Sequence, residues 1–445
     1  MQSSRTAKSA GALLRTRRFA TSSSSPPSRS HRVVVVGAGT AGLAIGHQLL
    51  RRGDFAASDI ALVDPATWHH YQPGWTLVGG GLKNKEDLRR RLDELVDPKL
   101  RLYKSAVASV APGDNLVRLS DGDVLSYEHL VVAPGLTVDY DSVEGLREAL
   151  RSDGPVSTIY SYDSCDKAFR TIEGLAGGTA IFTQPAGVIK CAGAPQKIMW
   201  LALHRWKQAG LYDGSGSGSG PGPGSAIRIS FATGLPAMFA VPKYAARLEQ
   251  LRRERGVEGL FQHDLVAVRG NEATFARPNG DAVVRKFDLL HVTPKMGAPA
   301  FIRESGLANA AGYVDVDDGT LRHARFPNVW SAGDASSLPT SKTAAAVTAE
   351  APVLVRNLLR AMEGKEPDAS YDGYTSCPLV TEYGKVLLAE FKYGGEPKET
   401  FDDWLGVDQA EPRRAFYHLK KDFFPWVYYA SMVKGTWGGP RGWIN

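Results

Sequence analysis

The sequence predicts an α/β protein with two Rossmann-like domains, each a parallel sheet covered by helices, followed by a C-terminal segment of different composition. Two βαβ patterns support this prediction. One starts at His31 and reaches its second strand at residues 60–64, and the other starts near residue 171 and includes a helix around residues 195–208. From about residue 366 the chain becomes rich in aromatic residues. A chain of 445 residues is also too long for one ordinary domain.

The first 31 residues resemble a mitochondrial presequence. Residues 1–32 contain six Arg, one Lys, nine Ser and no acidic residue. This composition is typical of an organelle transit peptide, and residues 17–22 resemble a matrix-protease site. The alternative is a disordered tail without a targeting role. Because these seven positive charges exceed the net charge of +6, the rest of the chain is close to neutral and nucleic-acid binding has no electrostatic basis.

A glycine fingerprint follows the first predicted strand. Gly37, Gly39 and Gly42 come directly after four valines and open an apolar-periodic helix. Gly37 permits a tight turn, Gly39 lets the backbone approach a pyrophosphate, and Gly42 allows the helix to pack closely on the strand. Asp64 ends the second strand 22 residues after Gly42, where it can accept hydrogen bonds from an adenosine ribose. This unit is therefore predicted to bind a dinucleotide.

Two further motifs indicate that the dinucleotide is FAD. Residues 130–135 resemble the return segment of flavoprotein disulfide reductases and NADH dehydrogenases, and residues 329–334 resemble the C-terminal FAD motif of those proteins, in which Asp334 would bind the ribityl chain. A helix then begins near Thr343, with Thr340 and Ser341 as other candidate caps. Its N-terminus would stabilise an anionic reduced flavin by roughly 0.3–1 kcal/mol. Lys342 would add a full charge, unless it is a solvated surface lysine.

The second βαβ unit lacks a glycine fingerprint. Residues 181–197 contain no GxGxxG, which argues against NAD(P)H as the reductant, and Cys191 lies there instead. Cys377 follows 186 residues later, so the two cysteines can meet only through the fold. A cysteine pair beside a flavin can accept a sulfur nucleophile by thiol–disulfide exchange and pass two electrons to the ring. The alternative for each cysteine alone is a buried structural role.

Five segments together resemble the eukaryotic mitochondrial sulfide:quinone oxidoreductases: residues 71–79, 191–199, 290–294, 339–347 and 371–380. The resemblance extends over nearly the whole chain, from about residue 32 to 440. It implies that hydrogen sulfide is the substrate, that Cys377 receives the sulfane sulfur as a persulfide, and that Cys191 becomes the thiolate that attacks the flavin. It also implies ubiquinone as the electron acceptor, a sulfur acceptor such as glutathione or sulfite, and a place at the mitochondrial inner membrane.

The motifs and the resemblance together define the candidate site. Cys165 lies in no motif typical of covalent flavin attachment, so we expect noncovalent FAD, and no cysteine spacing fits a metal site. Cys191 and Cys377 are the expected catalytic residues. The expected cofactor-binding residues are Gly37, Gly39, Ala41, Gly42, Asp64, Gln72, Val107, Ala133, Gly135, Asp334, Lys342, Thr343, Ala344 and Ala345.

We expect an FAD-binding domain made of residues 32–150 and 286–365. Residues 151–285 would form the second Rossmann-like domain, with a flexible Gly/Ser loop at residues 214–225. Residues 366–445 would form the C-terminal region that contains Cys377. No run of 18 uncharged apolar residues occurs in the chain, so no helix is expected to span a bilayer.

The end of the C-terminal region has the composition of a segment that lies at a membrane surface. Aromatic residues bordered by cations are typical of such segments; the alternative is core packing or a dimer contact. The aromatic residues are Phe423, Phe424, Trp426, Tyr428, Tyr429, Trp437 and Trp443, and the cations are Lys420, Lys421, Lys434 and Arg441.

Two other functions fit parts of the sequence. A type II NADH:quinone oxidoreductase would use FAD and quinone, but the missing second glycine fingerprint disfavours it. A non-catalytic FAD-bound redox sensor would need neither the two motif cysteines nor the aromatic segment.

Overall fold

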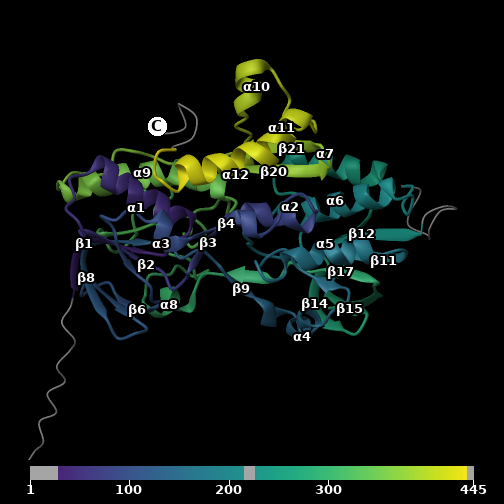
Figure 1. Cartoon of the computed structure of the whole chain (residues 1–445), viewed down its shortest axis with the longest axis horizontal. Helices are drawn as coiled ribbons and strands as arrows, with labels where there is room; N and C mark the ends of the chain where they lie inside the picture. The colour runs from purple at the N-terminus through teal and green to yellow at the C-terminus, as the bar shows by residue number, and fades with distance from the viewer. Residues whose placement is uncertain (1–28, 215–225, 438–445) are drawn as a thin grey trace, which may run out of the picture.

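The computed structural model describes residues 29–214 and 226–437. They form two α/β lobes, at the left and right of Figure 1, and a layer of C-terminal helices along the top. This arrangement confirms the predicted fold class of two Rossmann-like domains. Most of the expected presequence, nearly all of the Gly/Ser loop, and Trp443 and Arg441 of the aromatic segment lie outside the described residues.

The first lobe contains a sheet in the order β5-β2-β1-β8-β7-β6, in which β19 also pairs with β8. Strands β5, β2, β1, β8 and β19 are parallel to one another. Strand β7 is antiparallel to both of its neighbours, β8 and β6. The expected presequence boundary at residue 31 falls inside β1, because Arg29–His31 pair with β8. The strands are β1 (Arg29–Val36), β2 (Ile60–Val63), β5 (Arg101–Tyr103), β6 (Val107–Ala111), β7 (Leu116–Leu119), β8 (Val124–Val132) and β19 (Val329–Ser331).

Helices α1 and α9 pack against each other on this lobe. Helix α1 begins four residues after the end of β1, and α9 follows β19 after the longer loop of residues 332–343. Ligands of such sheets bind at the carboxyl edge of the parallel strands. The helices and smaller elements are α1 (Thr40–Arg52), β3 (Trp68–His70), η1 (Gln72–Gly74), η2 (Glu86–Leu88), β4 (Arg89–Arg91), α3 (Leu92–Leu95), α8 (Ala300–Glu304) and α9 (Ala344–Met362). The short helix α2 (Trp75–Gly79) follows η1 and packs against helices of the second lobe.

The second lobe contains a parallel sheet in the order β10-β17-β11-β12-β13 and an antiparallel sheet of β14, β15 and β16. The strands are β10 (Val156–Ser157), β11 (Gly178–Gln184), β12 (Ile227–Thr233), β13 (Glu258–Phe261), β14 (Asp264–Arg269), β15 (Glu272–Ala276), β16 (Ala282–Lys286) and β17 (Leu289–His291). The helices are η3 (Tyr140–Ser142), α4 (Leu146–Arg151), α5 (Cys165–Gly174), α6 (Ala194–Gln208) and α7 (Pro242–Glu254).

One expected domain boundary needs correction. Strand β17 lies within the segment 286–365 that we assigned to the FAD-binding domain, but it pairs with β10 and β11 of the second lobe. The chain therefore returns to the first lobe after β17 and not at residue 286. The return is marked by β18 (Lys295–Gly297), which pairs with β9 (Thr137–Asp139) where the chain leaves the first lobe. A strand read alone does not show which sheet it joins.

The C-terminal region is not a separate element, because it packs on both lobes. Its hairpin contributes Leu379 and Phe391 to the core of the second lobe, whereas Tyr428 and Met432 belong to the core of the first. Between them α10 projects from the top of the molecule (Figure 1). The elements are β20 (Thr375–Glu382), β21 (Lys385–Phe391), η4 (Tyr393–Gly395), α10 (Thr400–Leu405), α11 (Arg414–His418), η5 (Leu419–Phe423), α12 (Phe424–Val427) and η6 (Tyr428–Met432).

Candidate active site between the lobes

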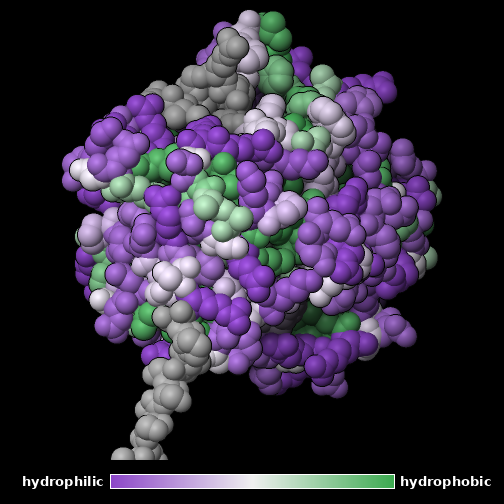
Figure 2. Space-filling view, turned by 60° about the vertical axis from the view of Figure 1, so that its left-hand side comes forward, coloured by the Kyte–Doolittle hydropathy of each residue, from purple (hydrophilic) through white to green (hydrophobic). Residues whose placement is uncertain are grey.

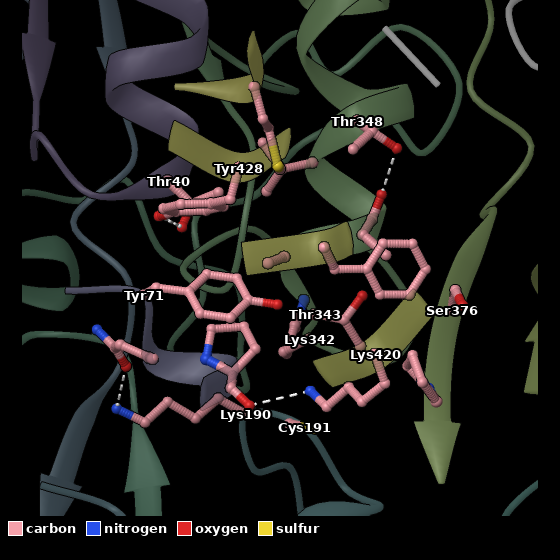
Figure 3. A pocket seen from close by; sticks show the side chains of 18 of the residues that line it. Thr40, Tyr71, Lys190, Cys191, Lys342, Thr343, Thr348, Ser376, Lys420 and Tyr428 are labelled. Carbon is pink, nitrogen blue, oxygen red and sulfur yellow. Dashed lines mark hydrogen bonds between the residues drawn. The ribbon is translucent and has the colours of Figure 1, made fainter. Parts of the chain in front are cut away.

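A cavity of about 520 Å³ lies where the two lobes and the C-terminal helices meet (Figure 3). Its walls come from the starts of α1 and α9, the segment after β8, the loop before α6, the β20–β21 hairpin and the helical run from η5 to η6. Cofactor and small-molecule sites in proteins have volumes of roughly 300–1,000 Å³. The cavity is therefore large enough to hold a ligand.

The glycine loop between β1 and α1 forms one end of this cavity. Gly37 has a φ of +91°, and a Cβ there would lie 2.4 Å from the carbonyl oxygen of Ala133. A Cβ at Gly42 would lie 1.8 Å from the carbonyl oxygen of Gly37, whereas a Cβ at Gly39 would meet no atom within 4 Å. The loop is thus tightly packed on one side and open on the other. The unpaired N–H groups of the first helical turn make this end suitable for a phosphate.

Most of the expected cofactor-binding residues line the cavity. Gly37 and Gly42 serve the packing of the loop, and Val107 lies in β6, outside the lining. Asp64 also lies outside it; its carboxylate accepts hydrogen bonds from the N–H groups of Ala38 (2.7 Å) and Ala66 (2.8 Å) and so holds the glycine loop. The expected residues in the lining are Gly39, Ala41, Gln72, Ala133, Gly135, Asp334, Lys342, Thr343, Ala344 and Ala345.

The start of α9 forms another wall. Of the three candidate caps, Thr343 is the N-cap, and its hydroxyl accepts a hydrogen bond from the N–H of Ala346 at 3.0 Å. Lys342 is buried, so the surface-lysine alternative is wrong. Its Nζ donates to the carbonyl oxygens of Ser336 (2.7 Å) and Leu338 (3.0 Å), and burial lowers its pKa.

Cys191 lines the cavity, and the Cys377 thiol lies buried behind it, within hydrogen-bond reach of Cys191. Cys191 lies in the loop before α6 with a φ of +52°, and its N–H donates to the carbonyl oxygen of Lys342 at 2.7 Å, which joins this loop to the first lobe. Cys377 lies in β20 and is buried. A Cβ at Gly193 would lie only 2.6 Å from the Cys377 sulfur, so the turn into α6 needs glycine there. Both cysteines are free thiols in this structure.

The charges around the pair favour a thiolate on Cys191. A hydrogen bond from the Cys377 thiol, together with the charge of Lys197, holds the pKa of Cys191 well below its usual range despite burial. The Nζ of Lys197 is buried and lies 3.3 Å from the Cys191 sulfur. Sharing this hydrogen bond, along with burial, raises the pKa of Cys377. The two thiols are therefore chemically unequal, as nucleophile and leaving-group roles require.

Two lysines near the thiols were not predicted as site residues. Lys197 follows Cys191 by six positions, and only the turn before α6 brings the two together. Lys420, expected at a membrane surface, is buried; its Nζ donates to the carbonyl oxygen of Pro73 at 3.0 Å (Figure 3). Burial and the charge of Lys197 lower the pKa of Lys420 to about 8. A positively charged wall thus faces the thiol pair.

Cys165 lies away from this site. It begins α5, is buried, and does not line the cavity. Burial raises its pKa to about 12, so the thiol stays protonated and unreactive.

The lining of the cavity includes the exposed side chains of Trp404 in α10 and Phe423 in the tail helices, so we take this side as its mouth. Phe401, Trp404, Phe423, Phe424 and Trp437 line this mouth. Figure 2 shows hydrophobic side chains at the top of the molecule, at the height of α10 in Figure 1. The contribution of α10 was not predicted, although Phe401, Trp404 and Leu405 follow an i, i+3, i+4 pattern that could have indicated it.

The aromatic tail divides into an exposed and a buried part. Trp426 and Phe423 are exposed, together with Trp404 and Leu405 of α10. Tyr428 is buried, and Tyr429 is half-buried with its hydroxyl donating to the carbonyl oxygen of Leu88 at 2.8 Å. The alternative interpretation of this segment, packing in the core, is therefore correct for Tyr428 and Tyr429.

Within residues 29–214 and 226–437, no helix is long and apolar enough to cross a membrane. No group of three or more His, Cys, Asp or Glu side chains in the same ranges could hold a metal ion.

The comparisons with known proteins agree with one another. Residues 31–176 match the family described as pyridine nucleotide-disulphide oxidoreductase. The chain is 44% identical to the mitochondrial sulfide:quinone oxidoreductase of Schizosaccharomyces pombe over 94% of this chain and 93% of that protein. It is 42% identical to the protein of the same name from Dictyostelium discoideum, over 93% of this chain and 88% of that protein.

A solved structure shares the fold. The sulfide:quinone oxidoreductase of Aquifex aeolicus superposes with a TM-score of 0.72 over 92% of this chain and 93% of that one, at 17% identity. The high identity to the two eukaryotic proteins over nearly their full length shows that this chain is an enzyme of the sulfide:quinone oxidoreductase family.

Proposed function

We propose that this chain is an FAD-dependent sulfide:quinone oxidoreductase in which Cys377 takes up the sulfur of hydrogen sulfide and Cys191 passes the electrons to the flavin. The observation that carries the proposal is the position of the two thiols. Cys191 and Lys197 line a cavity that the N-termini of α1 and α9 also line, and the Cys377 thiol lies buried against Cys191.

The residues present fit a flavin dinucleotide. The open space at Gly39 and the N-terminus of α1 suit a pyrophosphate, and the N-terminus of α9, with Ala344 and Ala345 in the lining, suits the negative charge of a reduced ring. Asp334 lies in the lining, in position for a ribityl hydroxyl. When bound, FAD would accept two electrons from the thiol pair and give them to the quinone. Binding would be noncovalent, since Cys165 does not reach the cavity.

The thiol pair would cycle through a disulfide. Hydrosulfide attacks the Cys377 sulfur of the disulfide, the S–S bond breaks, and a persulfide remains on Cys377 while Cys191 leaves as the thiolate. Lys197 stabilises that thiolate. A nucleophile such as glutathione or sulfite then takes the outer sulfur and returns Cys377 to a thiol. The disulfide forms again when the Cys191 thiolate and the Cys377 thiol together lose one proton and two electrons, and FAD, when bound, would accept the electrons.

The apolar mouth would admit ubiquinone from a membrane. Phe401, Phe424 and Trp437 line it, and the exposed side chains of α10 and the tail border it. We call Trp404, Leu405, Phe423 and Trp426 the exposed apolar rim. Because Trp404 and Phe423 of this rim also line the cavity, insertion of the rim into a bilayer would bring the cavity to the quinone. The presequence composition and the mitochondrial relatives favour the mitochondrial inner membrane as the location.

An anaerobic titration tests the proposal. Sulfide should bleach the flavin of the purified protein, and NADH should not. The expectation that NADH does not bleach the flavin is supported by the loop before α6, which has no glycine fingerprint and is hydrogen-bonded through Cys191 to the first lobe. Rapid bleaching by NADH alone would favour the type II NADH:quinone oxidoreductase instead.

A further inference from the structure

The end of the tail packs against the first βαβ unit. The carbonyl oxygen of Val433 lies 2.6 Å from Nδ1 of His47, and Nε of Arg51 donates to the carbonyl oxygen of Lys434 at 2.9 Å. A Cβ at Gly435 would lie 2.7 Å from the backbone nitrogen of Gln48. The backbone of the tail is thus in direct contact with α1, the helix that follows the glycine loop.

Tyr428 connects this tail to the glycine loop itself. Its hydroxyl lies 2.8 Å from Oγ1 of Thr40 and 2.7 Å from Nε2 of His69, and Nδ1 of His69 lies 3.1 Å from the carbonyl oxygen of Ala38. Figure 3 shows Tyr428 next to Thr40 at the edge of the cavity. Ala38 and Thr40 flank Gly39, where the loop faces open space. The tail therefore contacts the loop at the position suited to the pyrophosphate.

The donor and the acceptor can be assigned for each of the three hydrogen bonds that join Thr40, Tyr428, His69 and Ala38. A carbonyl oxygen can only accept, so Nδ1 of His69 carries the hydrogen. Burial lowers the pKa of His69 to about 4, so the ring is neutral and its Nε2 accepts. The Tyr428 hydroxyl then donates to His69, and its oxygen accepts from the Thr40 hydroxyl. All three side chains are thus held in one arrangement.

We propose that Tyr428 is a positioning residue for the cofactor and that the docking of the tail and the binding of FAD are thermodynamically linked. The inference rests on the proposed binding of FAD at the glycine loop. Asp64 holds the N–H of Ala38 from one side, and the Tyr428–His69 pair holds Ala38 and Thr40 from the other. Linkage is reciprocal, so bound FAD also stabilises the docked tail. The exposed rings of Phe423 and Trp426 are then held in place best in the flavin-loaded enzyme.

Release of FAD from the holoenzyme tests the first half of the proposal. Tyr428→Phe removes the hydroxyl that contacts Thr40 and His69 and leaves Nε2 of His69 buried without its partner. Because a lost hydrogen bond of this kind changes an equilibrium by about threefold to tenfold, FAD fluorescence should appear about threefold to tenfold faster on dilution. Tyr429→Phe is the matched control: its hydroxyl, in the same helical run, donates to the carbonyl oxygen of Leu88 at 2.8 Å and, at a longer 3.4 Å, to that of His69, but makes no hydrogen bond to the His69 ring or to the glycine loop.

Thr40→Val provides a second variant that keeps the side-chain shape. If Thr40 acts through Tyr428, the double variant should release FAD less quickly than the product of the two single effects predicts. Equal release rates for Tyr428→Phe and Tyr429→Phe, or fully multiplicative effects in the cycle, would overturn the positioning role.

Hydrogen exchange tests the second half. Amides of residues 428–435 should exchange faster in FAD-depleted protein than in the holoenzyme, and Tyr428→Phe should reduce that difference; an exchange rate independent of FAD would refute the linkage. These readouts do not depend on sulfide. If FAD release and hydrogen exchange behave as expected but sulfide does not bleach the flavin, the proposed function is contradicted and the linkage stands. If sulfide bleaches the flavin but release and exchange do not behave as expected, the linkage is contradicted and the proposed function stands.

Discussion

Removal of two exposed apolar side chains from the rim should detach the enzyme from lipid without changing its thiol chemistry. Leu405 is 70% exposed and Trp426 is 64% exposed, and neither lines the cavity, whereas Trp404 and Phe423 do. The double variant Leu405→Ser/Trp426→Ser therefore alters the contact with the bilayer and leaves the lining of the cavity unchanged. Truncation before the tail would be a poorer test, because it would also remove Lys420 and Tyr428.

The size of the effect follows from the exposed area. A tryptophan side chain has up to about 250 Å² to bury, so the exposed part of Trp426 is on the order of 160 Å², worth about 4 kcal/mol if fully removed from water. Insertion to half depth gives roughly 2 kcal/mol. Leu405, treated in the same way, adds about 1 kcal/mol. A total of about 3 kcal/mol corresponds to a weakening of vesicle binding on the order of 100-fold.

Co-sedimentation with phospholipid vesicles measures this binding, and stopped-flow bleaching by sulfide measures the thiol half-reaction. Reduction of a long-tailed ubiquinone in the vesicles should fall together with binding, while bleaching stays at the wild-type rate. The control is Val284→Ser, which removes an exposed apolar side chain from β16 in the second lobe. If the double variant bound vesicles within about threefold of the wild type, the rim would not be the membrane contact.

Three further predictions concern buried groups. Cys191→Ser and Cys377→Ser should each abolish sulfide-dependent quinone reduction with FAD still bound, whereas Cys165→Ser should retain near-normal turnover; a single active variant of the pair would contradict the relay. Burial raises the pKa of Glu350 to about 7. The folded state therefore favours the protonated carboxyl, and the contribution of Glu350 to the free energy of unfolding is complete at acidic pH and is lost as pH rises through about 7. Glu350→Gln should raise the thermal unfolding midpoint at pH 8 but not at pH 4. The pKa of Lys420 is lowered to about 8, so its charge beside the thiols is lost above that pH; bleaching of the wild type by sulfide should slow there, and Lys420→Met should lack this step.

The local parts of this protein could be predicted from the sequence. The glycine fingerprint, the cap at Thr343 and the strands and helices of both Rossmann units depend on neighbouring residues, since backbone conformation and capping are short-range effects. Gly37 and Gly42 show this clearly: each lies where any side chain would collide with a backbone carbonyl group. The missing second fingerprint was likewise visible in the order of residues 181–197.

Contacts between residues far apart in the sequence could be seen only in the tertiary structure. The sequence marked Cys191 and Cys377 as a pair by resemblance, but the charge of Lys197 beside them depends on how the loop before α6 turns. Lys420 and Tyr428 appeared as part of one surface segment, yet the helical run directs Lys420 toward the thiols and Tyr428 toward the glycine loop. The reason is physical. Composition shows that a segment is amphipathic, but which of its faces is buried depends on the surface against which the segment packs.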